Sequence, residues 1–154
     1  MIRKGWFTVS SGSIPMFQRI NHVGVIVGDL EEARRWLGEV FGLPLRRTAD
    51  LPAGRIHGEF YGCGDVDIEV ITIGDPEVRQ RRLGNARARI EHIAVEVSDL
   101  GAVLNRLAEL GVRTTTPEPQ RVGNNLVAWT VEETTGGISY QLIEPVVRGA
   151  SASP

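Results

Sequence analysis

Residues 20–30 read Ile20-Asn21-His22-Val23-Gly24-Val25-Ile26-Val27-Gly28-Asp29-Leu30, and the pattern returns as Ile90-Glu91-His92-Ile93-Ala94-Val95-Glu96-Val97-Ser98-Asp99-Leu100. His22 and His92 lie 70 residues apart, as do Asp29 and Asp99. The chain has only 3 histidines, so two of them stand at equivalent points of a repeat. A period of this length predicts two copies of one structural module.

Length and composition are typical of a soluble globular protein. The chain has 154 residues, of which 42% are hydrophobic and 23% charged, which suits one domain or two half-domains that share a core. A net charge of −2 predicts neither nucleic acid nor an anionic membrane as a partner. No apolar run reaches the roughly 18 residues that span a bilayer. The single cysteine, Cys63, excludes an internal disulfide and predicts a cytoplasmic protein.

The two ends of the chain are predicted to lie outside the repeat. Residues 1–17 are rich in serine and glycine near position 11 and lack the apolar run of a secretory signal, so they predict a flexible leader. Met16 is a candidate for the natural start. Residues 147–154 are predicted to form a tail.

The first copy predicts a βαβββ module over residues 18–75. Residues 18–27 alternate as a half-buried strand, and Asp29 is placed to cap a helix that continues to Phe41 and ends at Gly42. Residues 44–54 are expected to be a loop. Three further short strands are predicted within residues 43–73, the best of them at 56–61 and 66–73.

The second copy predicts the same order of elements over residues 90–146. It follows a polar linker, residues 76–89, with one or two helical turns. Its strands are expected at 90–97 and near 112–116, 126–132 and 137–144. Its helix is expected to begin after Asp99 and end at Gly111. The fold class is therefore α+β, with two βαβββ modules. Each module leaves a half-open sheet, so two must pair, within one chain or across a dimer.

Alternation along the first strand of each copy places its histidine on the face opposite the valines. Gly24 and Ala94 follow two residues later on that face, and their small size is expected to leave room for something bound. A second pair of similar segments lies near the end of each module. Asp67-Ile68-Glu69-Val70-Ile71 corresponds to Ser139-Tyr140-Gln141-Leu142-Ile143.

Two imidazoles, a carboxylate and an amide oxygen would then converge from four strands. His22, Glu69, His92 and Gln141 make a reasonable ligand set for a divalent metal with open coordination positions. The alternative is that both histidines are structural, as a lone histidine on a strand usually is. Their equivalence in the repeat favours a metal site. Glu144 lies three residues after Gln141, hence on the opposite face, and is expected to lie outside the site.

Residues 18–146 resemble the vicinal oxygen chelate superfamily of glyoxalases, methylmalonyl-CoA epimerases, extradiol dioxygenases and bleomycin- or fosfomycin-resistance proteins. The similar motifs are Asn21-His22-Val23-Gly24-Val25, Asp67-Ile68-Glu69-Val70, Glu91-His92-Ile93-Ala94 and Tyr140-Gln141-Leu142-Ile143. The resemblance implies a glyoxalase-like curved mixed sheet around a metal cavity. It also implies metal ligands at the positions of His22, Glu69, His92 and Gln141.

The second module is most similar to the methylmalonyl-CoA epimerases. The similar segments are Pro119-Gln120-Arg121-Val122-Gly123, Val127-Ala128-Trp129 and Thr134-Thr135-Gly136-Gly137-Ile138. One position departs from the family, because Gln141 stands where glutamate is usual and an amide accepts no proton at neutral pH. A catalytic base must then come from elsewhere, with Glu69 and His57 as candidates. The epimerases place an acidic base on the strand of His57 and Glu59, although a surface role for His57 is equally open.

The resemblance implies a metal-dependent isomerase, epimerase or lyase that works through a metal-stabilised enolate of a carbonyl or thioester substrate. Cobalt, nickel, manganese, zinc and iron are all candidate metals. A small molecule is the expected substrate, with an acyl-CoA as a candidate, and a homodimer is the expected assembly. The alternatives, in order, are a lactoylglutathione lyase, an Fe(II) dioxygenase and a metal-free drug-binding protein. The ligand set of the dioxygenases has its carboxylate where this chain has Gln141, and a metal-free pocket has no need of the histidines.

Overall fold

The computed structural model describes residues 15–145, so most of the predicted leader and all of the predicted tail lie outside the described residues. The strands are β1 (Arg19–Val27), β2 (Leu45–Leu51), β3 (Ile56–Cys63), β4 (Val66–Ile73), β5 (Ala88–Glu96), β6 (Gln120–Val122), β7 (Asn125–Trp129) and β8 (Ser139–Pro145). The helices are α1 (Leu30–Arg34), which continues as the π-helix η1 (Arg35–Val40), α2 (Pro76–Arg82) and α3 (Leu100–Glu109), with short 3₁₀ turns η2 (Ala53–Arg55) and η3 (Glu132–Thr134). No helix within residues 15–145 is long and apolar enough to cross a membrane.

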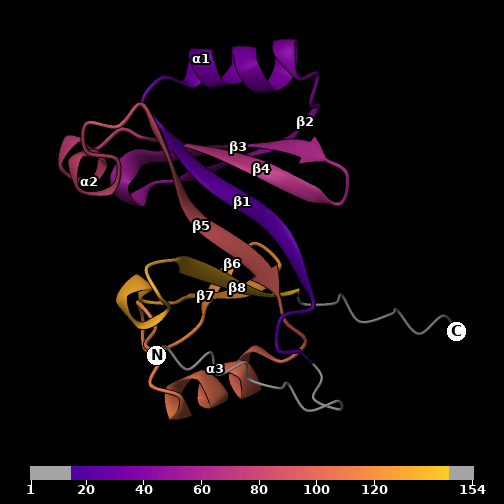
Figure 1. The fold of residues 1–154 in the computed structure, drawn as a ribbon, viewed down its shortest axis with the longest axis vertical. Helices are drawn as coiled ribbons and strands as arrows, with labels where there is room; N and C mark the ends of the chain where they lie inside the picture. The colour runs from indigo at the N-terminus through magenta and orange to yellow at the C-terminus, as the bar shows by residue number, and fades with distance from the viewer. Residues whose placement is uncertain (1–14, 146–154) are drawn as a thin grey trace, which may run out of the picture.

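All eight strands form one sheet in the order β2-β3-β4-β1-β5-β8-β7-β6. β1 pairs with β5 in antiparallel fashion at the centre, while β4 and β8 lie parallel to β1 and β5 on either side. Figure 1 shows β1 and β5 running side by side between the two modules. The modules therefore pair within one chain through their first strands, and the predicted α+β fold of two βαβββ modules is confirmed.

The central β1–β5 pair contains two β-bulges, one in each strand. Pairing shifts by one residue between Ile20 and His22, so Asn21 is the extra residue of β1. It shifts back between Gly24 and Val25, where Glu91 is the extra residue of β5. A bulge turns a side chain away from strict alternation. Each extra residue directly precedes a histidine of the repeat.

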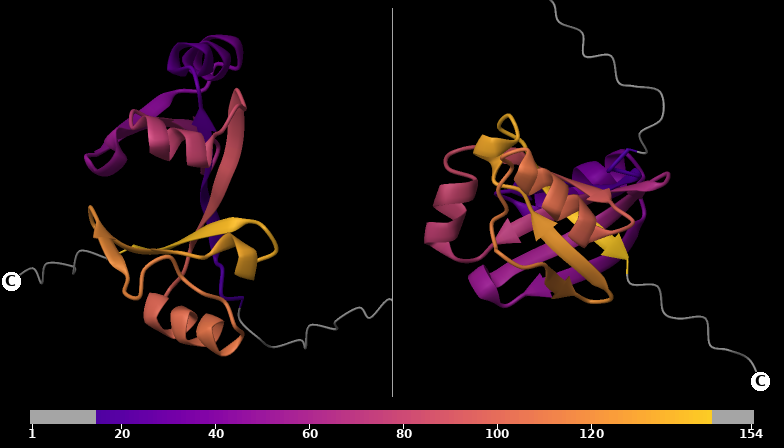
Figure 2. Two further views of the ribbon diagram at one scale, coloured as in Figure 1. Left: turned by 90° about the vertical axis from the view of Figure 1, so that its left-hand side faces the viewer. Right: turned by 90° about the horizontal axis from the view of Figure 1, so that it is seen from below.

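The two modules begin their helices in the same way. The side chain of Asp29 accepts a hydrogen bond from the backbone N–H of Glu32 at 3.1 Å, and Asp99 accepts one from Ala102 at 2.8 Å. Both aspartates act as the predicted N-caps and satisfy a free N–H of the first turn. In Figures 1 and 2, α1 and α3 lie at opposite ends of the molecule, outside the curled sheet.

Helix packing buries the outer face of the sheet and leaves the inner face for a cavity. The apolar face of α3 packs on the second module, in a cluster of Val95, Val97, Leu100, Val103, Leu107, Ala128 and Leu142. Leu83 and Val78, at the end of α2 and within it, pack against Ile26, Ile71 and Ile73. Ile26 and Ile71 alternate in phase with His22 and Glu69, so α2 covers one end of the inner face.

Two predictions of local structure were wrong. The expected loop at 44–54 contains β2, whose residues are almost all exposed, so it carries no alternating apolar pattern. The expected strand at 112–116 is reduced to a single bridge between Thr114 and Thr130, and the last module instead uses the three-residue β6. β2 and β6 are the two edge strands of the sheet. An edge strand is held by pairing with one neighbour and need not be buried, so it carries no apolar pattern in the sequence.

Candidate metal centre

Two neighbouring rows of paired residues cross the centre of the sheet and contain the four predicted ligands. The first row consists of Phe60, Glu69, Gly24 and His92, on β3, β4, β1 and β5. The second consists of Asp67, His22, Ala94 and Gln141, on β4, β1, β5 and β8. Residues opposite one another on paired strands share a face, so both rows point to the same side of the sheet.

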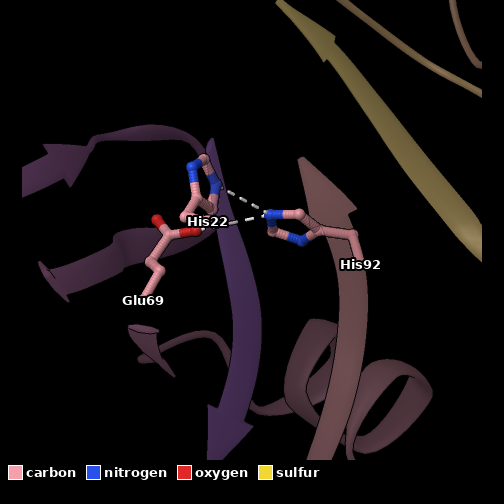
Figure 3. Close-up of side chains that lie close together, drawn as sticks. All are labelled: His22, Glu69 and His92. Atoms are coloured by element: carbon pink, nitrogen blue, oxygen red, sulfur yellow. Dashed lines mark hydrogen bonds and ion pairs between the residues drawn. The ribbon is translucent and has the colours of Figure 1, made fainter. Parts of the chain in front are cut away.

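His22, Glu69 and His92 meet at the centre of these rows, as Figure 3 shows. The Nε2 atoms of the two histidines lie 3.2 Å apart, and Glu69 Oε2 lies 3.2 Å from His22 Nε2 and 3.4 Å from His92 Nε2. Ligand atoms about 2.0–2.2 Å from a common metal ion lie roughly 3 to 3.5 Å from one another. The three atoms thus form a triangle of the size that one ion requires.

The residues before the histidines orient both rings. His22 Nδ1 lies 2.8 Å from Asn21 Oδ1, and the Asn21 amide in turn donates to Glu96 Oε1 at 2.7 Å. His92 Nδ1 lies 3.3 Å from Glu91 Oε2. An acceptor at Nδ1 holds the proton there and leaves the Nε2 lone pair free for a metal. Sequence reasoning missed Asn21 and Glu91, because alternation alone would turn them to the other face.

Gln141 supplies an independent indication of a missing partner. Its Oε1 atom is buried and has no hydrogen-bond partner among the described residues. Its side chain lines the same cavity as the triad. A buried oxygen without a partner costs about 1–3 kcal/mol, so such an atom calls for an explanation. A divalent metal with oxygen and nitrogen ligands would provide one, and the residues present fit that group.

The charges of the triad are coupled. Burial alone would raise the pKa of Glu69, but hydrogen bonds from His22 and His92 outweigh it and bring the pKa to about 2. Burial alone would lower the pKa of His92, but Glu69 and Glu91 raise it to about 9. The chain's own groups therefore stabilise a positive charge between the histidines and Glu69, at the place where a cation would bind.

The small residues two positions after the histidines have a more specific role than the one expected. Gly24 is paired with His92, and a Cβ at Gly24 would lie 2.2 Å from His92 Cε1. Ala94 is paired with His22 in the same way. The space at Gly24 is therefore occupied by the histidine of the other module, rather than kept open for a bound molecule.

His57 is not brought to this site. It belongs to β3, where Gly58 and Phe60 face the triad: a Cβ at Gly58 would lie 3.0 Å from Glu69 Oε1, and the Phe60 ring packs edge-on against His22 with centroids 5.3 Å apart. His57 and Glu59 alternate to the outer face. There His57 contacts Asp50 at 2.7 Å and Glu59 at 3.3 Å, and chiefly the Asp50 hydrogen bond raises its pKa.

Glu59 and Glu144 do not belong to the triad, and each has a hydrogen-bond partner in the fold. Glu59 is buried with an exposed fraction of 2%, and it accepts hydrogen bonds from Arg34 Nε at 3.1 Å and Tyr61 at 2.8 Å. It thereby ties α1 to β3. Glu144 accepts from the backbone N–H of Leu100 at 2.7 Å, at the start of α3, which agrees with its expected position outside the site.

A cavity of about 1040 Å³ opens over the triad and Gln141. Its first-module wall includes Arg47, Phe60 and Ile56, and its second-module wall includes Trp129 and Glu132. Phe60 and Trp129 hold equivalent positions, because Phe60 is paired with Glu69 and Trp129 with Gln141, the second predicted ligand of each module. Arg47 could not be found from the sequence pattern, because β2 is exposed and its segment reads as a loop, and Phe60 carries no signal that separates it from other apolar strand residues.

Comparison with known proteins agrees with this arrangement. Residues 19–140 match the family model "Glyoxalase/Bleomycin resistance protein/Dioxygenase superfamily". A lactoylglutathione lyase of Neisseria meningitidis is 32% identical over 121 residues, which cover 77% of this chain and 85% of that protein. The human mitochondrial methylmalonyl-CoA epimerase is 26% identical over 110 residues, which cover 70% of this chain and 62% of that protein.

The fold is shared with solved structures as well. A crystal structure of methylmalonyl-CoA epimerase from Mycobacterium tuberculosis superposes with a TM-score of 0.77 and 24% identity, covering 86% of this chain and 91% of that one. At that identity the likeness shows the fold alone. The family-model match over residues 19–140 establishes that this chain belongs to the glyoxalase/bleomycin resistance protein/dioxygenase superfamily.

Proposed function

We propose that this protein is a divalent-metal-dependent isomerase, epimerase or lyase that moves a proton on the carbon next to a substrate carbonyl. The observation that carries the proposal is the convergence of two histidines and one carboxylate below a large cavity. The buried, unpartnered oxygen of Gln141 stands beside them.

Some residues of the site would bind the metal, and others would orient the residues that bind it. His22, Glu69, His92 and Gln141 would hold the ion, and Asn21 and Glu91 would keep the two imidazoles in the tautomer that binds it. When bound, a divalent metal would act as a Lewis acid that stabilises negative charge on a carbonyl oxygen. Because Glu69 is the only anion among the four, the site would keep a positive charge of about +1 toward that oxygen.

Glu69 is the first candidate for the catalytic base. It is the only carboxylate in the ligand set, and it lies in the cavity beside both histidines. It would take a proton from the substrate carbon and can return it to a neighbouring atom on the same side. Inversion would need a second base on the opposite side of the substrate. β3 offers Gly58 and Phe60 to the cavity, so that second base does not come from this strand.

The similar proteins suggest two candidate classes of substrate for this chain. An acyl thioester of the methylmalonyl-CoA type is the first, supported by the epimerase relative and by the epimerase-like segments of the second module. A glutathione hemithioacetal, as for a lactoylglutathione lyase, is the second, supported by the 32% identical relative. The Fe(II) dioxygenase and the metal-free binding protein rank lower, because Gln141 replaces the carboxylate of the former and the triad has no role in the latter.

The cytoplasmic location and the homodimer stay predictions.

Elemental analysis tests the metal first. Protein purified without chelator or affinity metal is expected to hold close to one divalent ion per chain, and His92→Ala is expected to lose it. His57→Ala is the matched control, since it removes the third histidine, which lies outside the cavity. Wild-type protein that binds none of the candidate metals, even when they are supplied, would refute the proposal.

Proton exchange then separates the two substrates. In D₂O, metal-loaded protein is incubated with methylmalonyl-CoA or with the hemithioacetal of methylglyoxal and glutathione, and NMR follows deuterium at the carbon next to the carbonyl. Exchange in the thioester supports the epimerase assignment, and conversion of the hemithioacetal supports the lyase assignment. Glu69→Gln is expected to abolish either activity.

A further inference from the structure

Arg47 occupies a place on the cavity wall that the proposed chemistry does not use. Its guanidinium carbon lies 3.3 Å from the centroid of the Phe60 ring. Phe60 in turn packs edge-on against His22, with ring centroids 5.3 Å apart. A positive charge is thus stacked on the aromatic ring that borders the candidate metal ligand, and this cation–π contact fixes where the charge lies.

The sheet register explains why Arg47 faces the cavity. Arg47 on β2 is paired with Phe60 on β3, and Phe60 is paired with Glu69 on β4. Arg47 therefore extends the row of Glu69, Gly24 and His92 by two strands. Two strand spacings are about 10 Å, and the arginine side chain reaches back over part of that distance. Its guanidinium lies within reach of a small substrate bound at the triad.

The neighbouring arginine, Arg46, forms an ion pair with a carboxylate, whereas, among the described residues, Arg47 does not. A β-bulge lies between Leu45 and Arg47, where Arg46 donates to Asp67 Oδ1 at 2.7 Å and to the Gly64 carbonyl at 2.8 Å. Within residues 15–145, no carboxylate forms an ion pair with Arg47, and its contact with Phe60 uses the face of the guanidinium. Its N–H edges remain available for two parallel hydrogen bonds, the geometry that a carboxylate accepts.

We propose that Arg47 forms an anion subsite that binds a carboxylate of the substrate, apart from the carbonyl at the metal. This inference rests on the proposed function and narrows it to carbonyl compounds that carry a second, anionic group. Arg47 is a specificity-determining residue in this scheme. It contributes to binding rather than to proton transfer, because a guanidinium has hydrogen-bond donors but no acceptor that takes up a proton.

The test compares two probes that differ only in the proposed contact. Lactate and malate present the same adjacent hydroxyl and carboxylate oxygens to a metal, and malate adds a second carboxylate. Isothermal titration calorimetry on metal-loaded wild-type protein is expected to show malate binding about 10- to 100-fold more tightly than lactate, as for hydrogen bonds to a charged group. In Arg47→Met, which keeps most of the apolar stem, this ratio is expected to fall to near one while lactate binding is unchanged. Arg47→Lys is expected to keep part of the ratio, because charge remains and the planar fork is lost.

Arg35→Met is the matched control. Arg35 also lies beside an aromatic ring, 5.8 Å from the centroid of Trp36, but it is exposed and does not line the cavity. Its loss is expected to leave the malate-to-lactate ratio unchanged. An equal fall in Arg35→Met would show a general charge effect and overturn the inference.

The remaining outcomes separate this inference from the proposed function. Normal metal content and lactate binding with no preference for malate would overturn the Arg47 subsite alone. Inorganic phosphate that competes only in the presence of Arg47, without a preference for malate, would assign the subsite to a phosphate and overturn the carboxylate. Absence of bound metal from the wild type would overturn the proposed function and this substrate contact with it.

Discussion

The imidazole of His92 stands opposite Gly24 and fills the space that a side chain at Gly24 would need. The two residues are paired across the antiparallel β1–β5 interface, and an ideal Cβ on Gly24 would lie 2.2 Å from His92 Cε1 and 2.6 Å from Nδ1 and Nε2. Contacts under 3.0 Å require something to move. A glycine of one module thus sets the position of a candidate ligand in the other.

Gly24→Ala is therefore expected to displace the His92 ring and weaken metal binding. The added methyl group cannot coexist with the present ring position, and a ligand moved by even 1 Å no longer fits the ion's coordination distances. We expect the bound metal per chain to fall by more than half, as measured by elemental analysis after gel filtration. Gly28→Ala, where a Cβ would meet ordinary contacts of 3.5 Å or more, is the control and is expected to keep the metal. Full metal content in Gly24→Ala would show that His92 is not a ligand in its present rotamer.

Glu91→Ala is expected to weaken metal affinity by about 10- to 100-fold while leaving the fold intact. Its carboxylate accepts from His92 Nδ1 and also pairs with Arg82, so its removal frees the imidazole to rotate and to change tautomer. Competition with a chromogenic chelator measures the affinity. Glu109→Ala removes an exposed carboxylate of α3, paired with Arg106, and is expected to change nothing. Equal affinities for the two variants would argue that the ring needs no orienting partner.

Gln141→Leu is expected to change metal binding and stability in opposite directions. Replacing the buried, unpartnered Oε1 by methyl groups removes the cost of a desolvated oxygen. The free energy of unfolding of metal-stripped protein should therefore rise by about 1 kcal/mol, and metal affinity should fall because one ligand is lost. Urea unfolding in the presence of a chelator gives the first quantity and metal titration the second. A less stable metal-stripped variant would mean that the amide oxygen has a partner in solution.

The buried Glu59 predicts a specific loss of stability in acid. Its hydrogen bond from Arg34, against the opposing effect of burial, lowers its pKa from 4.5 to about 2. A carboxylate with a lowered pKa in the folded state stabilises the fold above its unfolded value and loses that contribution as the pH falls through its folded value. Glu59→Gln should cost roughly 2 kcal/mol at pH 7, as for hydrogen bonds to a charged group. The difference from wild type should shrink between pH 4.5 and pH 2.

Urea unfolding of wild type and Glu59→Gln across that pH range provides the measurement. Glu109→Gln serves as the exposed control, because its carboxylate is 66% exposed and a surface pair contributes little. A difference between wild type and Glu59→Gln that stays constant from pH 7 to pH 2 would contradict the ionised, buried carboxylate.

Much of the site could be anticipated because the relevant pattern is local. Alternation along a buried strand placed His22 and His92 on one face, and the repeat extended the same logic to Glu69 and Gln141. Where burial did not impose a pattern, prediction failed. β2 is exposed along nearly all its length, so its sequence predicts a loop and does not indicate that Arg47 faces the cavity. The strand that contains His57 predicts a place near the site, but the alternation along β3 turns His57 to the outer face.

The sequence by itself determined the repeat, the two N-capped helices, the βαβββ order and the four residues on the inner face. The repeat follows from the similarity of two segments 70 residues apart, and the elements and their inward-facing residues follow from the spacing within each segment. Only the tertiary structure decided that β1 joins β5 within one chain, that bulges bring Asn21 and Glu91 to the histidines, and that Gly24 accommodates the His92 ring. Strand register, bulges and packing between modules arise from pairing of segments far apart in the chain, and no local pattern encodes which residue stands opposite which.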